Sequence, residues 1–510
     1  MRKTFFFVFI VLTLLLAVIG WFHPAALWAY VVVLPLFALG IYDMLQPRHI
    51  ILRNFPLLGY FRYGFEFIAP ELQQYFIERH TDGRPFSRQQ RSLAYRRAKD
   101  VDDTVPFGTQ LDINASSYEG IRHTIYPKEK PGTPPRVKIG GAHCQKPYLA
   151  SLLNISAMSF GALSDRAVLS LNTGAHKGGF YHNTGEGGLS DHHLKPGGDL
   201  VWQIGTGYFG CRTPEGNFDA KLFQEKVAAH PQVKMIELKI SQGAKPGHGG
   251  VLPAVKNTPE IARIRHLEPH TTVISPPGHT AFHDANSLLE FIGKLRELSG
   301  GLPVGFKLCI GRTEEFTEIC EQMVKTGMRP DFITVDGAEG GTGASPLEFT
   351  DSVGMPIEPA LMFVRRTLER FGLHGEIKVI ASGKVLTAAS LMKMLALGAD
   401  VCNSARGFLF SLGCIQALRC NTNKCPTGIT THNPALVKGI VVSDKGERVY
   451  NFHKNTLHTF MQLLAACGLD QVEGIRMSDL MRGDEFVQLA DRYFPDGLGA
   501  VMQAPPTASV

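Results

Sequence analysis

The chain has no strong excess of positive or negative charge, and this lack of an excess argues against some classes of binding partner. Its 510 residues include 52 Lys and Arg against 46 Asp and Glu, for a formal net charge of +6. Nucleic-acid-binding domains carry a dense basic patch or stripe, whereas the basic excess here is small and dispersed. We therefore expect no nucleic-acid partner.

Cysteine is too sparse to build a disulfide framework. The chain has nine cysteines, and outside one late group they are scattered, whereas disulfide scaffolds are short and dense in cysteine. Cys309 and Cys402 lie in apolar runs, which is typical of buried, reduced thiols. The catalytic part of the chain is therefore expected in a reducing compartment.

Long apolar runs are confined to the N-terminus. Residues 4–22 and 25–42 are almost wholly apolar, and each run is about long enough to cross a hydrocarbon core of roughly 30 Å. We interpret residues 1–45 as a transmembrane helical hairpin that places the protein in a membrane. A cleaved signal peptide is the alternative.

The flanks of these runs predict an orientation. Arg2 and Lys3 precede the first run, and Arg48 and Arg53 follow the second. Positive flanks mark the cytoplasmic side of a membrane span. The sequence therefore predicts an inner-membrane protein with two N-terminal helices and a cytoplasmic catalytic domain.

Beyond the hairpin we divide the chain into three parts. Residues 46–136 are mixed in composition and end in a proline-rich linker at 128–136. A basic run at residues 84–99 lies in this part, and we interpret it as a solvated or subunit-facing surface, with contact to anionic lipid headgroups as the alternative. Residues 137–435 are predicted to form the catalytic domain, and residues 436–510 a C-terminal helical extension.

The catalytic domain alternates apolar strands with helical patterns. Amphipathic stretches at 287–298 and 315–327 lie between the later strands, and β-branched apolar runs begin at residues 154, 235, 271, 303, 331, 378 and 399. Strands buried on both faces and separated by helices indicate a parallel α/β sheet. Polar and glycine residues follow each strand directly, where a (β/α)8 TIM-type barrel keeps its active site. A doubly wound sheet is the alternative, although no GxGxxG motif follows an early strand.

Glycine-rich clusters follow the last three of these strands, at residues 337–345, 381–385 and 403–407. Small residues expose backbone N–H groups to an anion, and the loops after the last strands of such a barrel commonly hold a phosphate. The clusters therefore predict a phosphate-bearing cofactor, with Gly340, Gly341, Thr342, Ser382, Gly383, Ser404, Ala405 and Arg406 as its binding residues.

Other polar residues indicate a substrate site. Lys239, Gln242 and Lys245 share a glycine-rich loop, and two cations with an amide suit a dicarboxylate, although two solvated lysines would give the same pattern. Glu186 lies between glycines, where it could position or deprotonate an amine. The alternative is an acidic loop residue without a catalytic role. Lys307 lies inside an apolar strand and needs a partner, either a flavin ring edge or an internal ion pair.

Three cysteines, Cys414, Cys420 and Cys425, follow the last glycine cluster. Their spacing matches no zinc-finger pattern, and a zinc site would need His432 as its fourth ligand. Three thiolates suit an iron–sulfur cluster that lacks one iron, so we predict such a cluster. Zinc and inert core cysteines are the alternatives.

Six motifs resemble the FMN-binding synthase domain of the glutamate synthase large subunit, specifically its short stand-alone, archaeal-type relatives. The motifs are SAMSFGALS (156–164), NTGEGG (183–188), KISQGAKPGHGG (239–250), ISPPGH (274–279), GGTGASP (340–346) and GCIQALRCNTNKCPTG (413–428). They appear in family order over roughly residues 140–433. The stand-alone relatives are favoured because DGAEGGTG replaces the HDGGTG of the large enzyme.

This resemblance implies a (β/α)8 barrel that binds FMN, with a 3Fe–4S cluster on the three cysteines as an electron relay. It implies that 2-oxoglutarate and ammonia form 2-iminoglutarate, which reduced FMN converts to glutamate. By position, Lys239, Gln242 and Lys245 would hold the 2-oxoglutarate carboxylates and Glu186 would lie at the ammonia entry. Ala157, Met158 and Ser159 would lie along the flavin.

The departures from the family leave several partners open. The family enzymes begin with a glutaminase domain, whereas this chain begins with the apolar hairpin, so we expect ammonia or another amine in place of glutamine. The electron donor is expected to be a protein or a quinol, and the oligomeric state, including a homo-oligomer, stays open. The alternatives are an N-alkylglutamate-type synthase and a membrane-linked flavin and iron–sulfur electron-transfer module.

Overall fold

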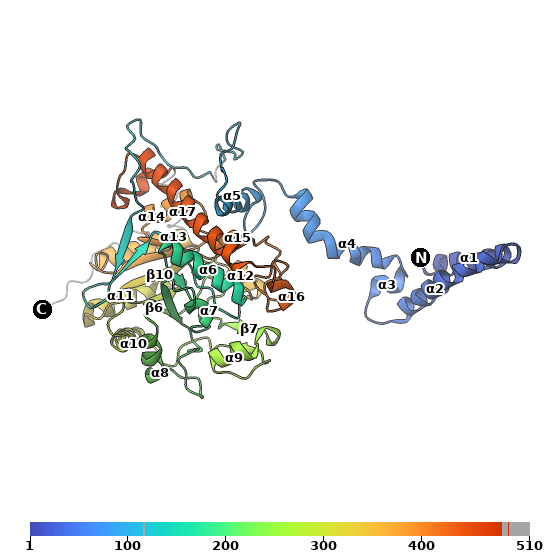
Figure 1. The fold of residues 1–510 in the computed structure, drawn as a ribbon, viewed down its shortest axis with the longest axis horizontal. Helices are drawn as coiled ribbons and strands as arrows, with labels where there is room; N and C mark the ends of the chain where they lie inside the picture. Colours follow the sequence, from blue (N-terminus) through green and yellow to red (C-terminus); the bar gives the residue numbers. More distant parts are fainter. Residues whose placement is uncertain (116–117, 482–487, 489–510) are drawn as a thin grey trace. The chain divides into compact units, whose positions relative to one another are not determined.

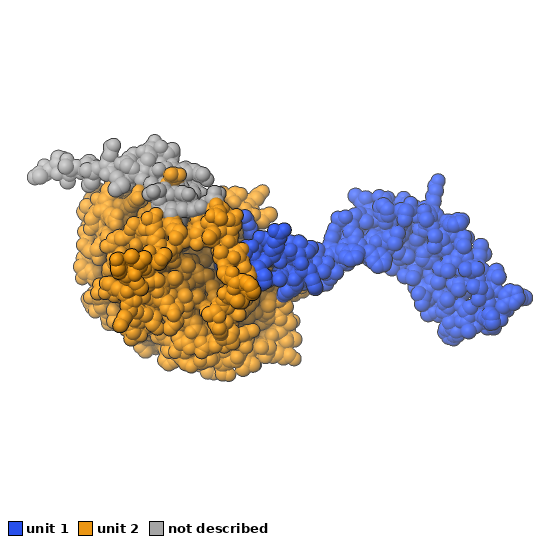
Figure 2. All heavy atoms as spheres, turned by 90° about the horizontal axis from the view of Figure 1, so that it is seen from above, with its two compact units in different colours: residues 1–89 blue, residues 90–510 orange. Residues whose placement is uncertain are grey.

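Two units make up the described part of the chain, residues 1–89 and residues 90–510 (Figure 2). The structure is a computed structural model that describes residues 1–115, 118–481 and 488. Part of the predicted C-terminal extension therefore lies outside the described residues.

The first unit is helical. It contains α1 (Arg2–Phe22), a 3-10 turn η1 (Pro24–Ala29), α2 (Tyr30–Leu45), α3 (Ile50–Asn54), α4 (Gly59–Leu72) and a π-helical turn η2 (Gln73–Ile77). The stretches Arg2–Phe22 and Pro24–Leu45 have the length and hydropathy of membrane-crossing helices. They pack against each other through Phe5, whose ring stacks on that of Phe37 at 5.7 Å and meets the bare backbone of Gly40.

The second unit contains a closed barrel of eight parallel strands (Figure 1). The neighbouring strands run in the order β10-β11-β12-β3-β4-β5-β6-β9. Their bounds are β3 (Leu153–Ile155), β4 (His182–Asn183), β5 (Leu200–Ile204), β6 (Val233–Lys239), β9 (Val304–Leu308), β10 (Phe332–Asp336), β11 (Lys378–Ser382) and β12 (Val401–Ser404). Closure confirms the predicted TIM-type barrel and excludes the doubly wound alternative.

Helices follow the strands along the chain. They are α6 (Asp165–Gly178), α7 (Asp191–Leu194), α8 (Ala220–Ala229), α9 (Pro259–Arg265), α10 (Ala285–Leu298), α11 (Thr313–Thr326), α12 (Leu347–Ser352), α13 (Ile357–Arg370), α14 (Ala388–Ala396) and α15 (Arg406–Leu412). The amphipathic stretches predicted at 287–298 and 315–327 correspond to α10 and α11. An Asp284–Ser287 capping box begins α10, which explains its start two residues before the predicted stretch.

The remaining elements precede and follow the barrel. They are α5 (Arg88–Lys99), the antiparallel pair β1 (Arg136–Ile139) and β2 (Tyr148–Ser151), the pair β7 (Val251–Leu252) and β8 (Val273–Ile274), a 3-10 turn η3 (Ala254–Lys256), α16 (Pro434–Val437), α17 (Val442–Ala466) and the turns η4 (Val472–Gly474) and η5 (Met477–Asp479). The long helix α17 packs along α6 on the outside of the barrel.

The barrel interior changes from apolar to polar along the strands. One end is filled by a buried cluster that also takes in the β1–β2 pair: Ile139, Ala150, Tyr181, Val201, Met235, Phe332, Ile380 and Val401. Further along the strands the buried residues are polar, among them Glu237, Lys239, Lys307 and Asp336. The polar end is therefore the carboxyl end of the strands, where a TIM-type barrel carries its site.

One predicted strand lies elsewhere. The run from residue 271 forms β8, which pairs with β7 outside the barrel. Ile274 is 70% exposed and two prolines follow Ser275, so this run lacks the two-sided burial of a barrel strand. The barrel instead contains β4 and β5, which were not among the predicted strands.

Candidate active site

Lys239 and Glu186 meet at the carboxyl end of the barrel. Lys239 ends β6, and Glu186 lies in the loop after β4. Their Nζ and Oε1 atoms are 2.9 Å apart. Both loops are packed too tightly for side chains at some of their glycines: a Cβ on Gly185 would lie 2.8 Å from the backbone nitrogen of Ser159, and one on Gly249 would lie 1.9 Å from the carbonyl oxygen of Ser275. The glycines of these motifs thus bring the two charged residues together.

Two further cations surround Glu186. Burial raises the pKa of this carboxyl, but Lys239, Arg265 and Lys245 outweigh that effect and hold the pKa below its ordinary value. Lys245 is 2% exposed and Arg265 is 5% exposed. One ionised carboxylate therefore lies among three cations, which leaves an excess of about two positive charges in a buried region.

Arg265 was not among the residues singled out from the sequence. It is the last residue of α9, and its Nη2 donates to the carbonyl of Phe160 at 3.1 Å. Its guanidinium lies over the ring of Phe209, 5.1 Å from the centroid. No motif marks this arginine, because Arg265 and Glu186 are far apart in the sequence and only the fold brings them together.

Gln242 and His279 complete this region. The side-chain Nε2 of Gln242 is buried and has no hydrogen-bond partner in the described structure. Burying an unpaired amide costs free energy, so this group has a donor ready for a ligand. His279, also missed from the sequence, holds the loop in place: its Nε2 hydrogen-bonds the Lys239 carbonyl at 2.8 Å and its Nδ1 the Tyr208 hydroxyl at 3.0 Å.

Below these groups, a buried carboxylate organises the barrel centre. Glu237 is 1% exposed and accepts hydrogen bonds from Asn183 Nδ2 at 2.7 Å, Gln203 Nε2 at 2.6 Å and Thr334 Oγ1 at 2.6 Å. Each donor comes from a different strand. The network therefore links β6 to β4, β5 and β10 across the barrel interior beneath the site.

Lys307 lies in an internal ion pair, one of the two roles considered for it. Its Nζ is 3.3 Å from Asp336 Oδ2. Burial lowers the pKa of Lys307, but Asp336 and Glu237 more than compensate and raise it above its ordinary value. Lys307 is therefore a charged ammonium at the barrel centre.

The three predicted phosphate loops follow the adjacent strands β10, β11 and β12. Gly341 and Thr342 are exposed, and a Cβ on Gly341 would lie 3.0 Å from the Arg406 side chain. Arg406 Nη2 donates to the Glu339 carbonyl at 2.8 Å, which links the first loop to the third. A cation beside bare backbone is a donor set that fits a phosphate.

The rest of the predicted cofactor set lies along the same edge. Ser382 and Ser404 are buried at the ends of β11 and β12, Gly383 follows the first and Ala405 the second, and Gly340 donates to Gly337 at 2.8 Å. Ser404 Oγ is committed to the Val385 carbonyl. The loop of Ala157, Met158 and Ser159 follows β3, and Met158 N donates to Asn183 at 3.1 Å. All of these residues therefore belong to neighbouring strand ends.

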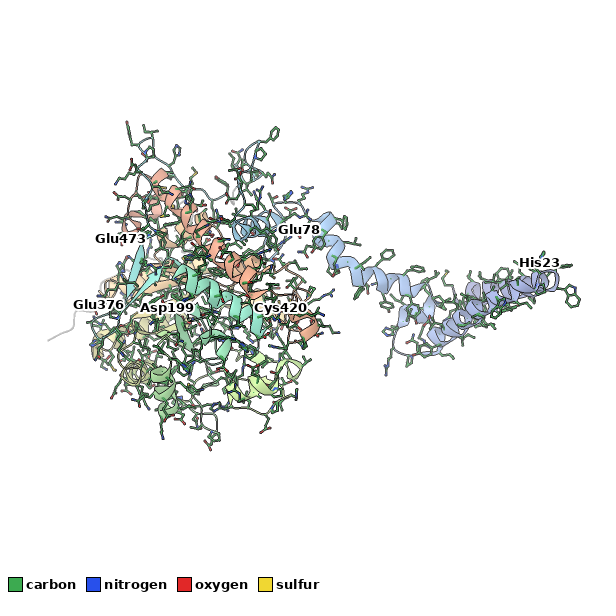
Figure 3. All side chains as sticks on the ribbon, in the orientation of Figure 1. His23, Glu78, Asp199, Glu376, Cys420 and Glu473 are labelled. Carbon is green, nitrogen blue, oxygen red and sulfur yellow. The ribbon has the colours of Figure 1, made fainter. Side chains whose placement is uncertain are left out.

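The three cysteines lie near one another in the loop after α15 (Cys420 is labelled in Figure 3). Burial raises the pKa of the Cys414 thiol to about 12, and the charges of Cys420 and Cys425 act in the same direction. Within the described residues, no group of three His, Cys, Asp or Glu is placed to hold a single metal ion. The iron–sulfur cluster on these three thiols therefore stays a prediction.

The zinc alternative needs His432, which has another role. Its Nε2 hydrogen-bonds the carbonyl of Gly161 at 2.9 Å, and its backbone N–H bonds Asn423 Oδ1 at 2.7 Å. This histidine therefore pins the cysteine loop to the loop after β3.

Helix α5 packs on the cysteine loop. The hydroxyl of Tyr95 donates to the carbonyl of Cys414 at 2.6 Å, and its ring meets Phe410 edge-on. Arg97 is 4% exposed and pairs with Asp103 at 3.1 Å. The basic run at residues 84–99 is thus partly buried, and the expectation of a solvated or subunit-facing surface is wrong for Arg91 and Arg97.

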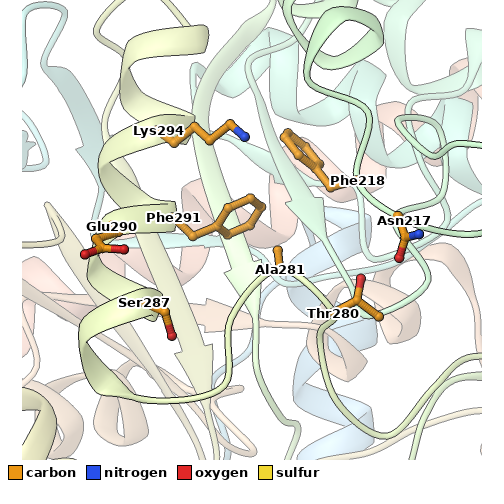
Figure 4. Close-up of a pocket in the computed structure, with 8 residues that line it drawn as sticks. All are labelled: Asn217, Phe218, Thr280, Ala281, Ser287, Glu290, Phe291 and Lys294. Atoms are coloured by element: carbon orange, nitrogen blue, oxygen red, sulfur yellow. The ribbon is translucent and has the colours of Figure 1, made fainter.

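A surface cavity of about 360 Å³ lies between α10 and the loops around Phe218 and Thr280 (Figure 4). Its lining residues are Asn217, Phe218, Thr280, Ala281, Ser287, Glu290, Phe291 and Lys294. None of them belongs to the site described above.

Comparison with known proteins identifies relatives over most of the chain. The glutamate synthase large subunit-like protein YerD of Bacillus subtilis is 40% identical over 469 residues, which cover 84% of this chain and 89% of that protein. The archaeal glutamate synthase [NADPH] of Methanocaldococcus jannaschii is 35% identical over 331 residues, covering 64% of this chain and 61% of that enzyme. This chain thus spans most of the first relative and less than two thirds of the second.

Solved structures with a similar course of the backbone include a flavocytochrome b2 variant with pyruvate bound. It is 13% identical, covers 92% of this chain and 96% of its own, and superposes with a TM-score of 0.43. The family model "Conserved region in glutamate synthase" matches residues 123–470. That stretch contains the whole barrel, the charged cluster around Glu186 and the cysteine loop, and this chain therefore belongs to the glutamate synthase family.

Proposed function

We propose that this protein is an oxidoreductase that aminates 2-oxoglutarate reductively to glutamate, with FMN and an iron–sulfur cluster as cofactors. The observation that carries the proposal is the charge balance around Glu186. Lys239, Lys245 and Arg265 exceed it by about two positive charges in a buried region. A dianion would neutralise that excess, and a dicarboxylate places one charge at each end.

The cations and Gln242 would bind and orient this substrate. Lys245 and Arg265 supply charge-assisted donors, and the unpaired Nε2 of Gln242 supplies another donor for a carboxylate or the 2-oxo oxygen. The ion pair with Glu186 holds Lys239 in position for a substrate carboxylate. These contacts would fix the carbonyl carbon for attack by ammonia, which forms 2-iminoglutarate and releases water.

Glu186 would act on the nitrogen. Its low pKa keeps it ionised at neutral pH, so it can hold an ammonium ion beside the substrate and accept a proton as ammonia attacks the carbonyl carbon. We infer that the nitrogen arrives as ammonia, free or delivered by a partner.

FMN would supply the hydride that reduces the imine carbon. The residues proposed to hold it are the three loops after β10, β11 and β12, whose exposed Gly341 backbone and adjacent Arg406 fit its phosphate. Ala157, Met158 and Ser159 would lie along the ring. The Lys307 ammonium, fixed by Asp336, would face the electron-rich edge of the ring.

Cys414, Cys420 and Cys425 would hold a 3Fe–4S cluster that relays electrons from a donor protein or a quinol. The hairpin α1–α2 would anchor the chain in the cytoplasmic membrane, with the catalytic domain in the cytoplasm. The length and hydropathy of the two spans support this anchoring.

Single-turnover kinetics tests the reaction. The flavin of the purified, lipid-reconstituted protein is reduced chemically under anaerobic conditions and mixed with 2-oxoglutarate and ammonium. We expect rapid reoxidation of the flavin and formation of glutamate, with neither reagent sufficient alone. Reoxidation only with another amine would indicate an N-alkylglutamate-type synthase. Failure with every amine would indicate an electron-transfer module.

A further inference from the structure

Helix α4 and the turn η2 carry an exposed apolar face that the proposed reaction does not use. Its members are Phe61, Phe65, Ile68, Leu72, Tyr75 and Phe76, which are 68%, 63%, 41%, 38%, 50% and 81% exposed. The first five are spaced by four, three, four and three residues, which places them on one side of a helix, and Phe76 directly follows Tyr75. We call these six residues the aromatic face.

Another side of α4 carries an ion pair, next to Phe67, which is 71% exposed. Arg62 and Glu66 form an exposed ion pair at 2.6 Å there, with side chains 59% and 52% exposed. Charged side chains thus lie on one side of the helix, and the aromatic face on another side is exposed instead of buried in a protein core. A contiguous exposed apolar patch of this size marks an interaction surface.

The start of α4 is fixed to one end of the α1–α2 hairpin. Asp43, fully buried near the end of α2, accepts hydrogen bonds from the Tyr60 hydroxyl at 2.8 Å and the Leu57 N–H at 3.1 Å. At the same end, Arg53 Nε donates to the Met44 carbonyl at 3.3 Å. The aromatic face thus begins where the apolar surface of the hairpin ends.

We propose that α4 lies in the headgroup region of the bilayer that the hairpin spans, with the aromatic face against the acyl chains. The inference goes beyond the proposed reaction and rests on the hairpin crossing the membrane. An amphipathic helix rich in aromatic residues on its apolar side binds at this depth. Arg48, Arg53 and Arg62 precede the first acid of this segment, Glu66, which suits anionic headgroups.

Tryptophan fluorescence in the full-length chain tests this placement. Trp21 and Trp28 are replaced by Phe, and Trp202, fully buried in the barrel unit, stays as an unquenched reference. One variant then receives Phe61→Trp on the aromatic face. The matched control receives Glu66→Trp, about 140° away around the helix at 3.6 residues per turn. Both positions are exposed, and an unchanged flavin spectrum checks that each variant is folded.

Each variant is reconstituted into vesicles of phosphatidylcholine and phosphatidylglycerol, with and without brominated acyl chains. We expect bromine to quench Phe61→Trp at least about threefold more than Glu66→Trp, because quenching needs contact with the acyl chains. Equal quenching of the two variants would overturn the proposal. An unquenched Phe61→Trp would also overturn it, and would indicate that a second copy or another protein covers the aromatic face.

The same vesicles distinguish a failure of the α4 placement from a failure of the proposed membrane anchoring or of the proposed reaction. Trp21 and Trp28 of the wild-type chain report on the hairpin, so their failure to be quenched would overturn both the anchoring and the α4 placement. Flavin reoxidation by 2-oxoglutarate and ammonium, measured on the same vesicles, tests the reaction independently.

Discussion

At the scale of single residues, Lys245 offers the most direct test of the dicarboxylate site. Lys245 is 2% exposed and lies in the electrostatic field of Glu186. A hydrogen bond to a charged group contributes roughly 1.5–3 kcal/mol. The Lys245→Met variant should therefore bind 2-oxoglutarate about ten- to a hundredfold more weakly while it retains its flavin.

Isothermal titration of the oxidised protein with 2-oxoglutarate measures this loss. Lys221→Met is the matched control, because the Lys221 side chain is 87% exposed and Lys221 is not among the predicted substrate-binding residues. Equal affinity in wild type and Lys245→Met would show that the dicarboxylate binds elsewhere.

Protonation of His279 makes the stability of the folded chain depend on pH. Burial lowers its pKa to about 4 from an ordinary value of 6.5. As the pH falls below 6.5, the unfolded chain takes up a proton that the folded chain refuses, so acid destabilises the fold through this residue. The expected loss is about 2 kcal/mol of unfolding free energy between about pH 6.5 and 5.

The His279→Gln variant should lack this contribution. Its thermal midpoint is expected below that of the wild type at pH 7, because the Lys239 loop loses a support, but to decline less steeply on acidification. Circular dichroism melts at several pH values measure both effects, with the exposed His283→Gln as control. Parallel declines in wild type and His279→Gln would contradict the role given to this histidine.

Some residues of the site were accessible from the sequence and others were not. Glu186, Lys239 and Lys245 stand in glycine-rich motifs, and glycine clusters mark close approach of backbone, so these residues could be predicted. Arg265 lies outside every listed motif, and His279 ends the ISPPGH motif without a signal for its role. Their roles depend on distances across the fold, such as the 2.8 Å from His279 to the Lys239 carbonyl, which no local pattern encodes.

At the scale of elements, the cysteine loop carries the next prediction. Cys420→Ser should remove most of the iron from anaerobically purified protein, which is expected to hold about three irons per chain. FMN should stay bound, since its proposed residues lie in the loops after β10, β11 and β12. Metal analysis and the flavin spectrum measure the two contents.

Cys467→Ser is the control for this loop, because Cys467 lies beyond α17 and outside the three-cysteine group. It should leave the iron content unchanged. Zinc as the dominant metal in the wild type, or full iron content in Cys420→Ser, would contradict the assignment.

The barrel elements show which patterns a sequence encodes well. Long apolar strands such as β6, β9 and β10 were predictable, since every one of their residues except Lys234 is buried. Strand β4 has only two residues, too few for a periodic pattern. The run at β8 has β-branched residues without two-sided burial. Arg97 in the basic run of α5 is buried because Asp103 and Thr456 of α17 bind its guanidinium.

At the scale of the whole molecule, the two units are encoded in different ways. The barrel unit is specified by alternating strands and helices and by motifs shared with the glutamate synthase family. The first unit is specified by hydropathy alone, and the family match begins only at residue 123. Inferences about the membrane therefore depend on physical arguments about residues 1–89 and need their own experiment.

Reporter fusions would establish the topology of the hairpin. The turn at His23 and Pro24 is flanked by Trp21 and Trp28, 86% and 79% exposed, whereas the positive charges of Arg2 and Arg53 lie at the other end. Because positive flanks stay on the cytoplasmic side, a reporter inserted at Pro24 should be external and one fused after residue 510 cytoplasmic. Mass spectrometry of the mature N-terminus provides the control. Cleavage near Ala29, or a cytoplasmic reporter at Pro24, would contradict the hairpin and restore the signal-peptide interpretation.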